Sequence, residues 1–256
     1  MGLREKQALE RRQRVLAAAH ELICRSGSVG LSMRALARRA ELSVQTVYNL
    51  FGSKGGVLHG LRLGIIETLY NQAEQSRPLD PLDYLLHLAE VGAATFAADP
   101  VVLRILMKAL KGSNLGANES SLTAGSVKMF QRPIEEAIEA GLLRADADAE
   151  FVARHLVIGF LGVLDLWVRE VLDDQGLRTH LLYIFTLMLL GVSAGAGRAR
   201  LLARYHRLQR ELPRVIREVD APLPLAGLAR GANVPAMRKP VSGSRLRNSR
   251  SAGLTV

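Results

Sequence analysis

The stretch that most constrains the fold of this chain is Leu31–Lys54, LSMRALARRAELSVQTVYNLFGSK. Within it, Met33–Ala40 places apolar side chains at positions i, i+3, i+4 and i+7, and Val44–Phe51 repeats that spacing. The spacing predicts two helices that each bury one face. Helices this short are not stable alone, so each must pack on the other and on a third helix. The expected buried positions of the second helix are Val44, Val47, Tyr48 and Phe51.

The second of these helices carries short polar residues opposite its apolar side. If Val47 and Phe51 face inward, then Gln45, Thr46 and Asn49 project outward. Side chains of this kind can hydrogen-bond base edges in the major groove of DNA. A helix, a tight turn and a second helix with a polar outer face form the arrangement of a DNA-reading helix-turn-helix.

Composition and charge indicate what kind of partner the chain has. The sequence is 48% hydrophobic and 5% aromatic, with much Leu, Ala and Val, a mixture that favours helices over strands. The net charge of +10 is unevenly distributed: residues 1–62 hold 11 basic and 4 acidic side chains, residues 63–197 hold 10 and 17, and residues 198–256 hold 13 and 3. Two basic ends around an acidic middle predict a polyanionic partner at the ends only.

Cysteine usage and hydropathy indicate a cytoplasmic protein with no membrane partner. Cys24 is the only cysteine, which excludes an intrachain disulfide and fits a reducing compartment. Its place on the first predicted helix suggests a thiol in the core. The charged N-terminal residues lack the apolar segment of a signal peptide. The uncharged run Leu181–Gly197 is slightly short for a membrane span and contains Thr186 and Ser193, so we interpret it as a buried interface helix.

The apolar periodicity predicts an all-α fold. Ser32, Ser43 and Ser53 are the expected N-caps of the second, third and fourth helices. Asp80 and Asp99, each followed by proline, are the expected N-caps of the fifth and sixth. The nine expected helices span about residues 10–25, 33–40, 44–51, 54–75, 81–97, 100–111, 119–140, 146–172 and 177–193, and a basic helix over residues 198–212 is expected to extend the ninth.

The N-terminal part of the chain resembles the DNA-binding domain of the TetR family of bacterial transcription regulators. The matching segments are RRQRVLAAAHELICRSG, SMRALARRAELS and VQTVYNLFGSKGGVLHGL. The later segment AIEAGLLRADADAEFVARHLVIGFLGVLDLW is similar to the seventh and eighth helices of such proteins. The resemblance implies an all-helical homodimer with a variable ligand-binding core. It also implies that the last two core helices, the eighth and ninth, pair with their symmetry mates in a four-helix bundle.

The resemblance and the composition together predict how the chain is divided. The expected parts are a flexible leader over residues 1–9, a three-helix DNA-binding domain over 10–70 with its helix-turn-helix at about 33–52, a ligand-binding and dimerisation domain over 71–197, and a basic helix with a disordered tail over 198–256. The tail is expected from Pro213 onward because Pro, Gly, Ser and Arg accumulate there and periodicity is lost.

Several residues of the predicted helix-turn-helix are candidates for phosphate contacts. Ser32 and Ser43 present hydroxyls at helix N-termini, which suit phosphate oxygens, and Arg34 adds a positive charge. The resemblance implies that Tyr48 and Lys54 also touch the DNA backbone. The full predicted DNA-binding set is Ser32, Arg34, Ser43, Gln45, Thr46, Tyr48, Asn49 and Lys54.

The predicted core helices carry aromatic and methionine side chains that could line a pocket. Few charged residues lie among them, which favours an apolar or amphipathic effector. The candidate ligand-binding residues are His87, Phe96, Met107, Met129, Phe130, Phe160 and Trp167. We expect no cofactor and no metal, because the six histidines show no zinc-site spacing and no cysteine partner.

Two positions depart from the family pattern. Glu41 stands in the turn where relatives usually have glycine, and a non-glycine residue in a left-handed conformation costs about 1 kcal/mol. Gly55 and Gly56 replace the usual helix-forming pair at the start of the fourth helix, where glycine is unfavourable. The glycine pair could loosen a hinge between the DNA-binding part and the core, or could simply be tolerated near the helix start.

Three function classes follow from the sequence. The first is a ligand-responsive regulator, most often a repressor in this family, with two recognition helices about 34 Å apart on a near-palindromic operator. The second is an architectural DNA-binding protein that uses its basic ends. The third, an enzyme, has weaker support: Gly191–Gly195 matches G-x-S-x-G, but only His206 follows Ser193 and no acid lies between them.

Overall fold

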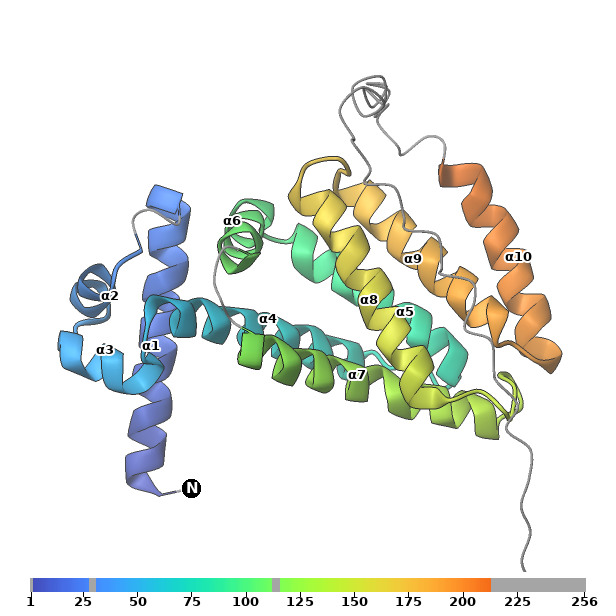
Figure 1. Ribbon diagram of the computed structural model, residues 1–256, viewed down its shortest axis with the longest axis horizontal. Coiled ribbons are helices and arrows are strands. Elements are labelled where there is room, and N and C mark those ends of the chain that lie inside the picture. The colour runs from blue at the N-terminus through green and yellow to red at the C-terminus, as the bar shows by residue number, and fades with distance from the viewer. Residues whose placement is uncertain (1, 28–30, 112–115, 213–256) are drawn as a thin grey trace, which may run out of the picture. The chain divides into compact units, whose positions relative to one another are not determined.

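The computed structural model describes residues 2–27, 31–111 and 116–212, and in these ranges the chain is helical (Figure 1). It forms ten α-helices there, and its β-type pairing there is an isolated bridge between Leu143 and Ser193. The predicted all-α class is confirmed, and the tail predicted from Pro213 lies outside the described residues. The helices are α1 (Leu3–Ser26), α2 (Met33–Ala40), α3 (Val44–Phe51), α4 (Lys54–Gln75), α5 (Pro81–Ala97), α6 (Pro100–Lys111), α7 (Gly116–Glu139), α8 (Ala149–Val168), α9 (Asp174–Gly191) and α10 (Gly195–Glu211).

Helices α1, α2 and α3 pack together, and we call them the head. Both α2 and α3 begin and end at the predicted residues. The hydroxyls of Ser32, Ser43 and Ser53 each accept a hydrogen bond from the N–H three residues later, at 3.0 to 3.1 Å. The three serines are therefore confirmed as N-caps, each of which stabilises a helix start by about 1 kcal/mol.

The first helix differs from the expectation at its start and at Cys24. It begins at Leu3 rather than near Glu10, because the intervening residues are good helix formers and the Glu5 carboxylate accepts a bond from Gly2 N–H at 2.8 Å. Cys24 is exposed, so its prediction as a core thiol is wrong. It lies one residue past the buried Ile23, which turns it about 100° away from the buried stripe.

The helix α3 is buried less than its pattern suggests. Val47 is its one fully buried side chain, and Phe51 is half-buried. Val44 and Tyr48 are 37% and 46% exposed, so their predicted burial is wrong. The reason is that α3 packs mainly on one neighbour, α2, and a single contact line covers only one row of side chains. The ring of Tyr48 therefore lies on the surface of the head.

Two arginines of α1 hold the carboxyl ends of the other head helices. Arg14 donates to Ala40 O at 2.5 Å, at the end of α2. Arg12 donates to Leu50 O at 2.9 Å, at the end of α3, and its guanidinium lies 4.5 Å from the centre of the Phe51 ring. A cation at a helix carboxyl end satisfies free carbonyl groups and opposes the negative end of the helix dipole.

Glu41 has the left-handed backbone conformation predicted for it, with φ 54° and ψ 47°. Its N–H donates to Arg38 O, and Leu42 N–H donates to Ala37 O, so the residue ends α2 in the way a glycine commonly does. The Arg14 guanidinium also lies 3.6 Å from the Glu41 carboxylate. This ion pair offsets part of the backbone cost, although exposed pairs contribute little.

Helices α4 to α9 come after the head in the chain and form the core of the fold (Figure 1). The expected boundaries hold for α4, α5 and α6. The helix α7 is continuous through Pro133 and begins at Gly116, three residues before its expected start. The helix α8 starts after its N-cap Asp148, and α9 starts after Asp173. Edge-on aromatic contacts between Phe130 and the buried Phe185 tie α7 to α9.

The basic helix α10 is separate from α9 and does not extend it as predicted. Between them the chain pairs with the loop after α7: Arg144 N–H donates to Val192 O, and Ala194 N–H donates to Leu142 O. These bonds turn the chain back, so α10 packs along α9. Its Arg200 makes ion pairs of 2.7 and 2.8 Å with Asp80 and Asp83 at the start of α5.

The glycine pair at the start of α4 has a steric reason at Gly56. A Cβ atom on Gly56 would lie 1.9 Å from Phe51 O, a backbone atom of α3 that cannot move away cheaply. A side chain is therefore excluded where α3 turns into α4. The replacement of both glycines by alanine cannot test for a hinge, because it would disrupt this junction.

We expect Gly56→Ala to destabilise the protein by more than about 1 kcal/mol, because the added methyl group forces the α3–α4 junction apart. Gly64→Ala is the matched control in the same helix, since a Cβ there meets no atom within 4 Å. The control should be neutral or stabilising by up to about 1 kcal/mol. Urea unfolding measures both, and equal effects would contradict the proposed clash.

Candidate functional site

The outer face of α3 presents a small set of polar side chains. Gln45 and Asn49 are exposed, and Thr46 is half-buried. Gln45 Nε2 donates to Asn49 Oδ1 at 2.9 Å, and the Ser43 hydroxyl lies 2.8 Å from that of Thr46. The face is therefore fixed by its own hydrogen bonds. The amide groups of Gln45 and Asn49 keep further donors and acceptors directed outward.

The predicted phosphate-contact residues surround this face. Ser32 and Ser43 lie at the exposed N-termini of α2 and α3, and the half-buried Lys54 opens α4. The exposed Tyr48 hydroxyl and Arg34 complete the set. All eight predicted DNA-binding residues thus belong to α2, α3 and the helix ends beside them.

The other arginines of α2 differ in their surroundings. Arg38 is exposed, like Arg34. Arg39 is also exposed, and its Nε donates to the Glu21 carboxylate of α1 at 2.6 Å. Arg39 therefore helps to hold α2 on α1, while Arg34 and Arg38 add positive charge to the surface of the head.

A cavity of about 340 Å³ lies in the core between α4, α5, α6, α7 and α8. Its walls are mostly apolar, and its volume falls at the lower end of the range for small-molecule sites. Five of the seven predicted ligand-binding residues line it: Phe96, Met107, Met129, Phe130 and Phe160.

The other two predicted residues do not line this cavity. His87 hydrogen-bonds the Ser76 hydroxyl at 2.8 Å, near the end of α4. Trp167 is fully buried, and its Nε1 donates to the Asp174 carboxylate at 2.7 Å. The buried indole N–H needs an acceptor and finds it on Asp174, at the start of α9.

Three polar residues line the cavity that sequence reasoning missed. They are Arg62 of α4, Ser126 of α7 and Asp165 of α8. Two of them could have been identified from the sequence, because Arg62 and Asp165 are charged residues within otherwise apolar helical segments. Asp165 pairs with Arg169 one turn along α8, at 2.5 Å. A charged group that lines an apolar cavity is a candidate for orienting a ligand.

Helix α4 connects the cavity to the head. Arg62 lines the cavity, and His59, one turn earlier, lies near Arg12 of the head. Burial lowers the pKa of His59, and the positive charges of Arg62 and Arg12 lower it further. Both effects favour the neutral form of the His59 ring.

Ser193 of the G-x-S-x-G match has a structural role. Its side chain is nearly buried, and its hydroxyl donates to Leu190 O at 2.8 Å, closing the end of α9. A nucleophile must instead face a base and a substrate. The hydroxyl of Ser193 is used in ending the helix.

Comparison with known proteins supports the identity of the head. Residues 15–61 match the model of the family described as bacterial regulatory proteins, tetR family. This segment runs from the middle of α1 into α4 and includes the whole of α2 and α3. No curated protein matches the chain closely enough to count as a relative.

Solved structures support the fold of the rest of the chain. A TetR-family transcriptional regulator from Syntrophomonas wolfei is similar with a TM-score of 0.60 and 19% identity, over 70% of this chain and 95% of that one. Another from Rhodococcus sp. gives 0.56 and 20%, over 70% and 99%. FadR from Thermus thermophilus, a TetR-family repressor in complex with lauroyl-CoA, gives 0.60 and 22%, over 70% and 94%.

The fold and the exposed face of α3 therefore define a helix-turn-helix DNA-binding regulator. Residues 15–61 carry the family's DNA-binding segment, and the described chain shares the fold of solved TetR-family transcriptional regulators. The family and the fold are those of regulators rather than of enzymes.

Proposed function

We propose that this protein is a cytoplasmic, homodimeric repressor that releases its operator when a small apolar or amphipathic molecule enters the core cavity. The observation that carries the proposal is the polar face of α3 on a head that matches the family model. The cavity beside α4 supports ligand response, because α4 also packs on α1 and α3. The DNA-binding part is proposed to span residues 10–70, and the ligand-binding and dimerisation part residues 71–197.

Gln45 and Asn49 are proposed to act on a base pair as one unit. With Gln45 Nε2 bonded to Asn49 Oδ1, the free groups are the Gln45 carbonyl and the Asn49 amino group. An acceptor beside a donor matches the N6 amino group and N7 of adenine in the major groove. Thr46, beside Gln45 in α3, is proposed to contact a base edge as well, and Ser32, Arg34, Ser43, Tyr48 and Lys54 are proposed to contact phosphates.

Footprinting on the DNA that flanks its own gene tests the proposed function. We expect protection of a near-palindromic site, with half-site centres about one DNA turn apart. An architectural protein that uses its basic ends would protect DNA without sequence preference, and this result would exclude a regulator.

On that site, Gln45→Ala and Asn49→Ala should each weaken binding by about 1–3 kcal/mol, measured by fluorescence anisotropy. The double variant should lose less than the sum, because the two side chains act together. Gln131→Ala is the matched control, since Gln131 makes the same kind of exposed bond to Glu135, at 2.8 Å on α7. If the double loss is strictly additive, the two amides do not form a single reading unit.

The effector is proposed to enter the cavity with its apolar part among Phe96, Met107, Met129 and Phe160 and its polar group near Arg62 or Asp165. FadR from Thermus thermophilus is in complex with lauroyl-CoA, which makes laurate and lauroyl-CoA suitable first probes. For release, the head must have two arrangements, one that fits the operator and one that does not. The effector shifts the population between them only if it binds one arrangement more tightly than the other.

We expect Met129→Trp to fill the cavity, keep operator binding, and abolish release by the active probe. Leu202→Trp is the control, because Leu202 is exposed on α10 and lies outside the cavity lining. Anisotropy titrations of the operator complex with each probe measure the response. Unchanged release from Met129→Trp would place the effector site elsewhere.

The proposed dimer forms through α8 and α9, which lie side by side (Figure 1). Apolar side chains on these helices remain exposed: Phe151, Ile158 and Leu161 on α8 at 51% to 61%, and Leu187 on α9 at 41%. Large apolar side chains that stay exposed on two neighbouring helices support an interaction surface there. In the part of the chain that the structure describes, α8 is the only single helix that is long and apolar enough to cross a membrane. Helices α5 and α6 meet these criteria only when they are counted together, and a 97° bend separates them. Because the other face of α8 packs in the core, we favour a protein partner over a membrane.

Ile158→Glu should convert the dimer to monomers, because a charge in a desolvated interface is strongly unfavourable. Val101→Glu is the control: Val101 is 61% exposed, but lies on α6. Sedimentation equilibrium measures both masses. A dimer that persists in Ile158→Glu would exclude this part of α8 from the interface.

A further inference from the structure

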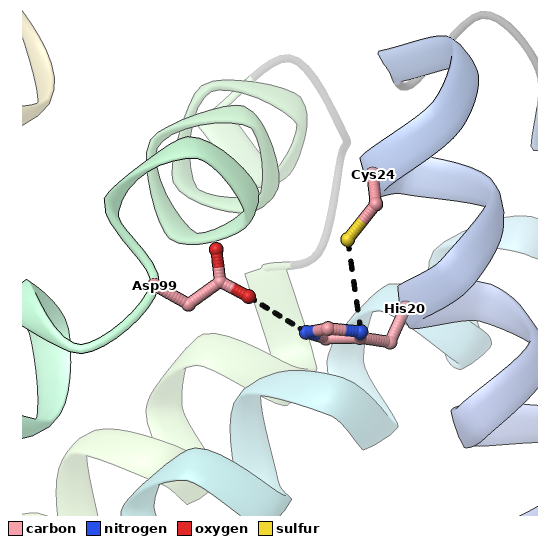
Figure 2. A group of neighbouring side chains, drawn as sticks. All are labelled: His20, Cys24 and Asp99. Atoms are coloured by element: carbon pink, nitrogen blue, oxygen red, sulfur yellow. Dashed lines mark hydrogen bonds and ion pairs between the residues drawn. The ribbon is translucent and has the colours of Figure 1, made fainter.

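Three side chains with metal-binding chemistry meet between the head and the core (Figure 2). His20 and Cys24 lie one turn apart on α1, and Asp99 lies at the start of α6. His20 Nε2 is 2.8 Å from Asp99 Oδ2, and His20 Nδ1 is 3.8 Å from Cys24 Sγ. Each residue offers one ligand atom, and these three atoms lie within 4.8 Å of one another.

We propose that His20, Cys24 and Asp99 form a binding site for a divalent transition metal ion of the zinc class. One nitrogen, one sulfur and one carboxylate oxygen suit a borderline-soft cation such as Zn²⁺ rather than Mg²⁺ or Ca²⁺. Three protein ligands leave the fourth tetrahedral position for water. The exclusion of metal by histidine spacing in the sequence therefore overlooked Cys24, four residues after His20, and Asp99, 79 residues away.

The geometry needs little adjustment. Bond lengths of about 2.0–2.3 Å place the ligand atoms of a tetrahedral zinc ion about 3.4–3.7 Å apart. The longest of the separations must therefore close by about 1 Å. The 2.8 Å pair of His20 Nε2 and Asp99 Oδ2 must open by about 0.6 Å. The side chains of His20 and Asp99 are 49% and 39% exposed, and Cys24 is also exposed, so they have room to turn towards a common ion.

The charges balance once the cation binds. The thiol of Cys24 gives up its proton to water, since the thiolate is the metal ligand. A thiolate, a carboxylate and a neutral imidazole then bring a total charge of minus two to a divalent cation. The second oxygen of Asp99, Oδ1, accepts from Val102 N–H at 3.2 Å, which fixes the carboxylate at the N-terminus of α6.

The site has a mechanical consequence because its ligands come from two parts of the fold. His20 and Cys24 belong to the head, whereas Asp99 belongs to the segment between α5 and α6. A bound cation is therefore favourable only while α1 stays against α6. By linkage, the cation stabilises that arrangement of head and core.

Cobalt titration of the full, reduced chain tests the proposal without DNA. Co²⁺ bound to a thiolate gives a ligand-to-metal charge-transfer band in the near ultraviolet, and Cys24 is the only possible source because the chain has one cysteine. We expect the band in the native sequence, its loss on adding Zn²⁺, and its absence from Cys24→Ser. Zn²⁺ should also raise the thermal midpoint of the native protein and not that of Cys24→Ser.

Two further variants distinguish a three-ligand site from a lone thiol. His20→Gln and Asp99→Asn should each weaken Co²⁺ binding at least about tenfold. Asp99→Asn keeps the N-cap of α6, so its effect does not depend on unfolding. His206→Gln, on the exposed surface of α10, is the control and should bind Co²⁺ like the native protein. No band in the native protein, or equal affinity in His20→Gln and Asp99→Asn, would overturn the proposal.

Discussion

A recognition helix of eight residues with one fully buried side chain has almost no stability of its own, and the rest of the head is built around that constraint. Helix α3 keeps an exposed polar outer face, so its stability comes from its two ends and from its packing on α2. Ser43 caps its start, and Arg12 donates to the Leu50 carbonyl near its end while lying over the Phe51 ring. At the far end, the bare backbone of Gly56 lets α4 begin directly against α3.

Much of this arrangement could be predicted from the sequence because it depends on local rules. Serine caps, proline after aspartate and apolar residues one turn apart placed α2 through α6 closely. The errors came where neighbours decide the outcome. Burial of Val44, Tyr48 and Cys24 depends on how far one helix overlaps another, which periodicity does not contain. The turn before α10 depends on hydrogen bonds to a loop some fifty residues earlier, between Ala194 and Leu142.

The functional sites show the same division between local and distant information. The polar face of α3 follows from spacing within one helix, and so could be predicted residue by residue, although its role in DNA binding stays a prediction. The cavity collects residues from five helices, and its polar lining, Arg62 and Asp165, was not predicted. Trp167 was expected there because it is large and apolar, but its N–H group needed the acceptor on Asp174.

The hydrogen bond between Gln45 and Asn49 restricts the conformational entropy of both side chains before any DNA is bound, and this affects sequence selectivity. Side chains that are immobilised only on binding lose about 0.5–1.5 kcal/mol each in rotamer freedom. Here that freedom is already restricted in the free protein, so a matching base pair is met by a preorganised surface. A mismatched pair gains nothing from induced adjustment, because the two amides would first have to separate. If Gln45 and Asn49 contact a base pair as proposed, wrong sequences would be rejected quickly, which suits a search over many competing sites.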